Sequence, residues 1–191
     1  MENKPVSTDI IFEAAQNGDL AEVKRLLEEG RNPNSVDTRL HWPLLHFATA
    51  GGHTDTVTLI LEQGGDIHQA SELTGATALH VAAFHGQLAT AKLLLHHGAT
   101  IDRASTGGDT PLHAAVLSNS PDLIGFLLAS GSPVNQTNIR GETTLHLAAG
   151  YGTAASVRAL LLSSKLQRTA DASGKFPIDL AATPEIKELL S

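Results

Sequence analysis

The chain has 191 residues and a mass of 20.0 kDa, enough for one compact domain or a short row of repeated units. Hydrophobic residues make up 41% and the formal net charge is −7, so we expect neither extensive disorder nor a basic nucleic-acid-binding surface. The absence of cysteine excludes disulfides and thiolate metal sites and fits a reducing compartment. Neither a secretion signal nor an apolar run long enough for a membrane span is present, so the sequence predicts a cytoplasmic protein, also compatible with the nucleus, that does not contact a membrane.

One short phrase recurs along the chain at a regular interval. Its copies, from the N-terminus onward, lie at residues 9–15, 43–48, 77–83, 110–115, 143–149 and 176–182. The apolar residues that anchor these copies follow one another at spacings of 34 or 33 residues and are Ile11, Leu45, Leu79, Leu112, Leu145 and Ile178. A constant period over nearly the whole chain indicates a row of similar structural units.

Each unit predicts a first helix, a tight turn, a second helix and a long polar turn. Thr77, Thr110 and Thr143 lie at N-cap positions of the first helices, and Pro111 follows at a first helical position. The second helices are predicted at 23–27, 57–61, 91–95, 124–128 and 157–161. Glycine ends four of them, because it takes the left-handed conformation readily, at Gly30, Gly64, Gly98 and Gly131. Asn34 and Asn135 follow two of these glycines and are expected to bond the turn backbone.

The period divides the chain into a tail and six units. The tail is 1–7, and the units are 8–37, 38–71, 72–104, 105–137, 138–170 and 171–190. The first two units each contain one extra residue, which we place in the turns near Leu40 and Ser71. The turn at 37–42 also lacks the glycine of its counterparts. Polar residues around the first unit and a shortened second helix at 183–190 predict capping ends.

This pattern resembles the ankyrin repeat. The signature phrase Thr-Pro-Leu-His-x-Ala is complete at 110–115 and nearly complete at 77–83 and 143–149. The resemblance implies an all-α solenoid of about six helix–turn–helix units with capping end units. It also implies that the long turns project as fingers and that the first helices line a concave face. The implied function is binding of another protein, as an adaptor, scaffold or inhibitor, by a monomer that is not an enzyme.

The histidines raise the question of a metal or acid–base site. Four of the ten belong to the repeated phrase, and they are His46, His80, His113 and His146. Each has apolar neighbours and no carboxylate at ligand spacing, so we interpret them as structural. No motif for a serine nucleophile or a phosphate-binding loop is present. We therefore expect no catalytic residue, no cofactor and no metal. An enzyme improvised on the concave face and a nucleic-acid binder remain as alternatives.

The resemblance places partner contacts in the fingers and in the two residues after the second alanine of each phrase. Carried onto this sequence, the predicted partner-binding residues are Arg39, Leu40, Trp42, Leu73, Phe84, His85, Leu117, Ile139, Arg140 and Tyr151. Tryptophan and tyrosine are enriched in binding hot spots, and the repeat core requires neither Trp42 nor Tyr151. We expect these two residues to hold one partner segment together with Phe84 and Leu117. For Leu117 and Ile139, the alternative is that they fill gaps between fingers.

The fifth unit has a mild excess of basic residues, namely Arg140, Arg158, Lys165 and Arg168. We interpret these residues as ordinary solvated charge. The alternative is an acidic motif of a partner that docks late in the row of units.

Overall fold

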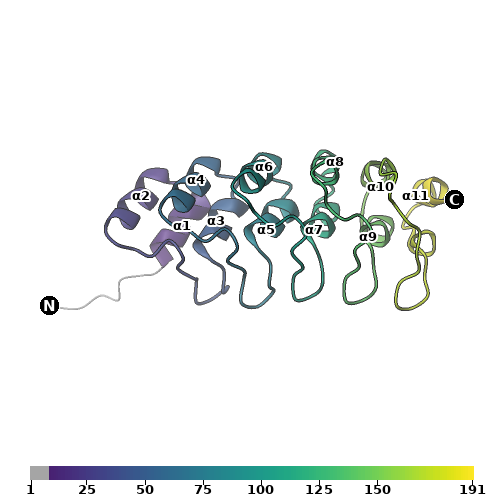
Figure 1. Cartoon of the computed structure of the whole chain (residues 1–191), viewed down its shortest axis with the longest axis horizontal. Coiled ribbons are helices and arrows are strands. Elements are labelled where there is room, and N and C mark those ends of the chain that lie inside the picture. The colour runs from purple at the N-terminus through teal and green to yellow at the C-terminus, as the bar shows by residue number, and fades with distance from the viewer. Residues whose placement is uncertain (1–8) are drawn as a thin grey trace.

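The computed structural model describes residues 9–191, so the predicted tail at 1–7 lies outside the described residues. Within that range the chain forms eleven α-helices and one 3₁₀ helix, which follow one another in pairs (Figure 1). The first helices of the pairs form one row: α1 (Asp9–Asn17), α3 (Leu44–Ala50), α5 (Ala78–Phe84), α7 (Pro111–Leu117), α9 (Thr144–Tyr151) and the 3₁₀ helix η1 (Pro177–Leu180). The second helices form the other: α2 (Leu20–Glu28), α4 (Thr54–Glu62), α6 (Leu88–His96), α8 (Pro121–Ala129), α10 (Ala154–Leu161) and α11 (Pro184–Leu190). The predicted all-α solenoid is confirmed.

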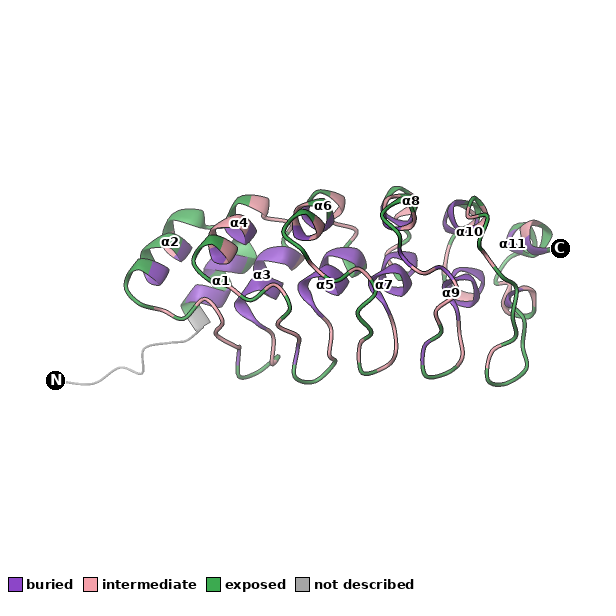
Figure 2. Cartoon of the chain, viewed as in Figure 1, coloured by how far each residue is buried: buried purple, intermediate pink, exposed green. Residues whose placement is uncertain are grey.

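The core is one continuous layer between the two rows of helices. Its largest fully buried side chains come from the second to the sixth unit and include Leu44, Ile60, Leu79, Leu94, Leu112, Leu123, Leu145, Leu160 and Ile186. Figure 2 shows the first-row helices mostly buried and the ends of the long turns mostly exposed. The alanines that follow the repeated histidines, such as Ala82 and Ala148, are fully buried, so adjacent first-row helices can approach closely. No helix of residues 9–191 is long and apolar enough to cross a membrane.

The repeated Thr and His residues form a hydrogen-bonded capping pair at the start of α5, α7 and α9. The backbone N–H groups of Thr77, Thr110 and Thr143 donate to Nδ1 of the histidine three residues later, at 3.1, 3.2 and 3.0 Å. Because Nδ1 accepts, the ring proton lies on Nε2, which donates to a carbonyl of the next finger. These carbonyl acceptors belong to Asp109, Glu142 and Lys175. The histidines therefore join neighbouring units, which confirms their predicted structural role.

In the second unit the histidine bonds the next finger, but the hydrogen bonds to a threonine at the N-cap are missing. Pro43 lies at the N-cap of α3, and proline offers neither a backbone N–H nor a hydroxyl. His46 still bonds the Ala76 carbonyl through Nε2 at 2.8 Å, but its buried Nδ1 has no hydrogen-bond partner. A buried polar atom without a partner lowers stability, so this cap is a weak point of the fold.

We expect Pro43→Thr to raise the free energy of unfolding by about 1 kcal/mol. The new cap and the partner for Nδ1 stabilise the folded state by roughly 1–3 kcal/mol, and the lost rigidity of proline offsets roughly 0.4–1 kcal/mol. Threonine fits because Pro43 and Thr77 both have extended backbones, with ψ of 150° and 172°. Urea denaturation measures the change, and the reverse variant Thr110→Ala should lose about 1 kcal/mol. A Pro43→Thr protein no more stable than the wild type would contradict this account of the cap.

The fingers of the first units contain the predicted extra residue in their tips. The N–H groups of His41 and Gly75 reach back four residues, to the carbonyls of Asp37 and Ser71, each at 2.8 Å. Gly108 instead reaches back three residues, to Ser105 at 3.0 Å. His41 occupies the position of the finger glycines and takes a left-handed φ of 52°, which is unfavourable for a residue with a Cβ atom. Its ring Nδ1 lies 2.8 Å from the Glu72 carboxylate, so the finger at 37–42 keeps its shape without glycine.

Two asparagines fix the backbone where the long turns begin. Asn34 Nδ2 donates to the Gly64 carbonyl at 3.0 Å, and Asn135 Nδ2 donates to the Lys165 carbonyl at 2.7 Å. Their Oδ1 atoms accept from the N–H groups of Asp66 and Gln167. The predicted bonding of these side chains to the turn backbone is confirmed, and it also links adjacent units.

The last unit departs from the predicted helix–turn–helix form. Its first helix is the single 3₁₀ turn η1, which ends at Leu180. The helix cannot continue toward Thr183, because Pro184 disfavours the α-conformation at the preceding residue. Thr183 instead caps α11, with its Oγ1 accepting from the Ile186 N–H at 3.2 Å. The shortened second helix of this unit is as predicted.

Candidate protein-binding surface

A groove of about 390 Å³ lies where the first-row helices α5 and α7 meet the fingers of neighbouring units. We call it the central groove. Its apolar lining residues include Trp42, Val81, Phe84, Ala114 and Leu117. Polar residues complete it, among them His85 at the C-cap of α5 and Thr74, Thr106 and Asp109 of the fingers. Phe84 and Leu117 are 56% and 40% exposed, so large apolar side chains face solvent in a concave site.

Trp42 links the groove to the core. The indole is half-buried and packs against the core, with its ring centroid 5.6 Å from that of Phe47 in an edge-on arrangement and 6.0 Å from the ring of His46. The expectation that the repeat core does not need Trp42 is therefore wrong. Trp42 directly precedes Pro43, the N-cap of α3, so its ring can pack on Phe47 in that helix.

Two predicted residues lie side by side at the end of α5. The ring of Phe84 meets that of His85 edge-on, with centroids 5.4 Å apart. Both residues line the central groove together with Trp42 and Leu117, so the structure brings together four of the ten predicted partner-binding residues. Because Leu117 lines an open groove, it does not merely fill a gap between fingers.

The other predicted finger residues lie outside the central groove. Leu40, Leu73 and Ile139 are at least half exposed, and the last is 77% exposed. Arg39 lies 3.6 Å from the buried Asp37 carboxylate. Arg140 Nε donates to the Glu142 carboxylate at 2.6 Å, and this hydrogen bond is the main reason why the pKa of Arg140 is raised. These side chains form an exposed edge rather than a site with convergent groups.

Tyr151 is also apart from the central groove. It is the last residue of α9, is 68% exposed and does not line the groove. The position that corresponds to Phe84 and Leu117 in this unit is Gly150, which has no side chain to continue the apolar lining. The predicted contact of one partner segment with Trp42, Phe84, Leu117 and Tyr151 therefore has no apolar side chain to use at position 150.

A family model described as ankyrin repeats (3 copies) matches residues 11–105 and 112–190, nearly all of the chain. The chain belongs to the ankyrin repeat family. The ankyrin repeat-containing protein P1E11.10 of Schizosaccharomyces pombe (strain 972 / ATCC 24843) is 36% identical over 62 residues. That match spans 32% of this chain and 30% of the yeast protein, so the chain corresponds to less than a third of that relative's length. Ankyrin repeats are generally protein-interaction modules.

The sequence did not identify every residue of this ankyrin groove. Val81 and Ala114 line it, although each is less than 10% exposed. They occupy the position directly after the repeated histidine, where the other units have Phe47 and Leu147. The side chain at this position differs in size from unit to unit, although the rest of the phrase is nearly constant. That variation could have identified Val81 and Ala114 from the sequence.

Two buried histidines of the ankyrin phrase favour their neutral forms. Burial lowers the pKa of His80 and of His113, outweighing the backbone carbonyls and carboxylates that favour their charged forms. Neutral rings suit a hydrogen-bond role at neutral pH. Across residues 9–191, no three His, Cys, Asp or Glu side chains lie close enough together to hold a metal ion.

Proposed function

We propose that this chain is a protein-binding ankyrin repeat module, acting as an adaptor, scaffold or inhibitor, whose central groove receives an apolar side chain of a partner protein. The observation that carries the proposal is the convergence of Trp42, Phe84 and Leu117, from three successive units, on one groove. Exposed apolar side chains that gather in a concave site are typical of binding surfaces. The fingers would then add contacts around this anchor, with Leu73 and Ile139 as the most exposed apolar groups.

Several further parts of the proposal come from the sequence and the family. We propose that the module works as a monomer, that it binds protein rather than nucleic acid, and that it has no catalytic activity of its own. Its net charge of −7 supports a protein partner over nucleic acid. Cell fractionation tests the predicted location in the cytoplasm and the nucleus, and light scattering tests the monomeric state.

Binding to the central groove should depend on Phe84 and Leu117. The probes are fragments from a proteome-derived display library that are selected on the wild-type chain and then titrated by calorimetry. Phe84→Ala removes an exposed aromatic anchor and should lower the affinity of these fragments about thirtyfold, the loss typical of a hot spot of about 2 kcal/mol. Leu117→Ala should lower it in the same direction.

Leu20→Ala on α2 is the matched control, because Leu20 is 39% exposed and Leu117 is 40% exposed. This control should bind as the wild type does, and all three variants should keep nearly the wild-type melting temperature. Selected fragments that bind Phe84→Ala and Leu117→Ala with unchanged affinity would exclude the central groove as the main site. Trp42→Ala is a poor test, since loss of its packing on Phe47 should lower stability as well as binding.

A further inference from the structure

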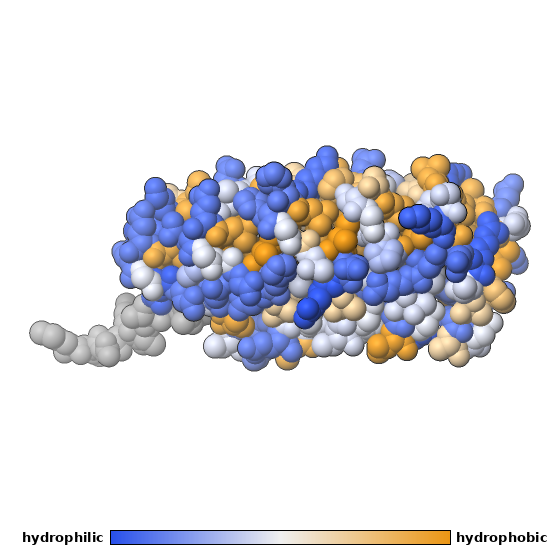
Figure 3. Space-filling view, in the orientation of Figure 1, coloured by the Kyte–Doolittle hydropathy of each residue, from blue (hydrophilic) through white to orange (hydrophobic). Residues whose placement is uncertain are grey.

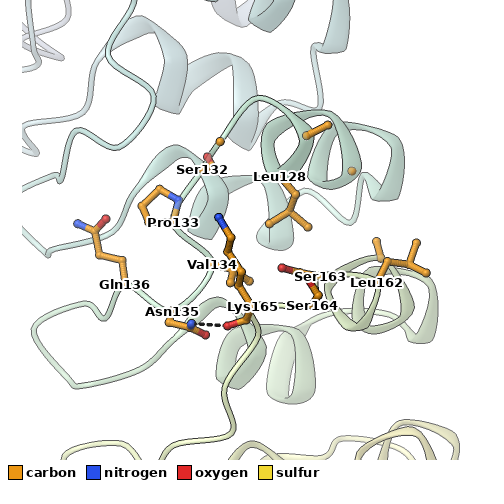
Figure 4. Close-up of a pocket in the computed structure, with 14 residues that line it drawn as sticks. Leu128, Ser132, Pro133, Val134, Asn135, Gln136, Leu162, Ser163, Ser164 and Lys165 are labelled. Carbon is orange, nitrogen blue, oxygen red and sulfur yellow. Dashed lines mark hydrogen bonds between the residues drawn. The ribbon is translucent and has the colours of Figure 1, made fainter.

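A second and larger hollow lies on the other row of helices. It has a volume of about 870 Å³ and opens between the C-terminal ends of α8 and α10 (Figure 4). Leu128, Ser132, Val134, Leu162 and Lys165 are among the residues that line it, and none of its lining residues belongs to the central groove. We call it the α8–α10 hollow. It belongs to the second helices and the turns that follow them, so the proposed function does not account for it.

The hollow exists because three positions depart from the repeat at the same place. The fourth unit has Gly125 where the other units have Lys24, Thr58, Lys92 and Arg158. The fifth unit has Leu162 where the others have Glu28, Glu62, His96 and Ala129. It also has Ser164 where the others have Gly30, Gly64, Gly98 and Gly131. Since the rest of the two units keeps the period, these three changes are local.

Each departure opens the hollow or makes it more apolar. Gly125 lies in the middle of α8, where glycine weakens a helix, and a Cβ atom added there would meet nothing within 4 Å. Without a glycine stop, α10 ends at Leu161, and the chain leaves it without a left-handed residue. Leu162 is left 87% exposed at the edge of the hollow. Figure 3 shows apolar side chains gathered over this end of the second row, whereas the α2 end is mostly hydrophilic.

One polar side chain in the wall of the hollow, Ser132, lacks a hydrogen-bond partner, whereas Asn135 is fully bonded. Ser132 is 7% exposed, and its hydroxyl oxygen is buried with no hydrogen-bond partner. Three basic residues of the fifth unit are engaged, Arg140 with Glu142, Arg158 with Glu185 and Arg168 with the Leu190 carbonyl.

Lys165 differs from these arginines, because its ammonium group has no acidic partner among residues 9–191. The bond from Asn135 to its carbonyl fixes its backbone, and its side chain extends along the hollow (Figure 4). No acidic residue lines the hollow, so it combines an apolar wall with one uncompensated positive charge.

We propose that the α8–α10 hollow is a second binding site, which takes a segment of a partner protein that has a leucine-like side chain next to a carboxylate. The apolar side chain would pack on Leu128, Val134 and Leu162. The carboxylate would pair with the Lys165 ammonium group. Such a segment supplies what the hollow lacks, namely apolar contacts for the 87% exposed Leu162 and a negative charge for Lys165.

The test starts from a displayed library of short random peptides, selected on the wild-type chain and counter-selected on Gly125→Leu. A Cβ atom at this position meets nothing within 4 Å, so the leucine should extend into the hollow. It also replaces glycine by a good helix former, so the variant should melt at or above the wild-type temperature. The enriched peptides are then synthesised and titrated. We expect them to contain an aliphatic residue next to Asp or Glu, and to bind Gly125→Leu at least tenfold more weakly than the wild type.

Two further variants test the chemistry. Lys165→Met keeps the side-chain stem and removes the charge, so the affinity should fall and its salt dependence should weaken. Leu162→Ser, at an 87% exposed position, should also lower the affinity with little change in melting temperature. Lys187→Met, on α11 and away from the hollow, is the matched control and should bind the peptides unchanged.

The central groove is tested separately by the same peptides. Phe84→Ala should bind them as the wild type does, so loss of binding in this variant would assign them to the groove and overturn the proposal of a second site. A selection that yields no peptide sensitive to Gly125→Leu, or only peptides without a carboxylate, would overturn it as well. Because the two sites share no residue, failure at one leaves the other unaffected.

Discussion

Replacing Leu112 by alanine should lower the free energy of unfolding by about 2–5 kcal/mol, the range for a large-to-small change at a buried leucine. Leu112 is fully buried in α7, the first helix of the fourth unit. The helix packs against α5 and α9 on its two sides and against α8 above it, so a cavity at Leu112 weakens contacts with both neighbouring units. In a solenoid each unit contacts only its neighbours, and a weak central unit reduces the cooperativity of the whole row.

Leu117→Ala provides the matched control on the same helix. Leu117 lies five residues further along α7 and is 40% exposed, so the identical chemical change should cost less than about 1 kcal/mol there. Chemical denaturation followed by circular dichroism measures both variants. If Leu112→Ala were as stable as the wild type, the register that places this leucine in the core would be wrong.

The period predicted most of the fold because each local feature depends on a few residues in a row. Thr77, Thr110 and Thr143 determine where three first helices begin, and the glycine at the end of a second helix determines where the long turn begins. These contacts lie within a unit or between one unit and the next, so a constant spacing implies a constant geometry. The exception is the last unit, where Pro184 limits the first helix to the turn η1.

The binding surface was less predictable, because it depends on contacts between different units. Nothing near Trp42 in the sequence shows that its ring packs on Phe47 and also lines a groove with Phe84. The α8–α10 hollow needs the departures at Gly125 and Leu162 to meet across two helices. Each is unremarkable by itself, and their proximity appears only in the folded chain.

The stability of the protein should fall as the pH decreases from about 7 to 5, because buried histidines of the repeated phrase must stay neutral in the folded state. Burial lowers the pKa of His46 from 6.5 to about 4, and it lowers the pKa of His80 and His113 as well. The groups that face His46 are the Ala76 carbonyl, which favours its charged form, and the His80 ring, which opposes it. Its Nδ1 has no partner, since Pro43 occupies the cap position.

The sign follows from where the protons bind. Between pH 6.5 and about 4 the unfolded chain binds a proton at His46 and the folded chain does not, so acid favours unfolding over that range. Each pKa unit corresponds to 1.36 kcal/mol, which gives a loss of about 2 kcal/mol from His46 alone between pH 7 and 5. His80 and His113 add to this loss. The loss from His46 is complete only below its folded-state pKa of about 4.

Urea denaturation at pH 7, 6 and 5 measures this slope in a range where carboxylates with ordinary or lowered pKa values remain ionised. His46→Leu is the informative variant, because it removes the titrating group and keeps an apolar side chain in the buried site. It should be less stable than the wild type at pH 7, since the hydrogen bond to the Ala76 carbonyl is lost, but its stability should change less with pH. A wild-type stability that is constant from pH 7 to 5, or an unchanged slope in His46→Leu, would show that His46 does not resist protonation in the folded protein.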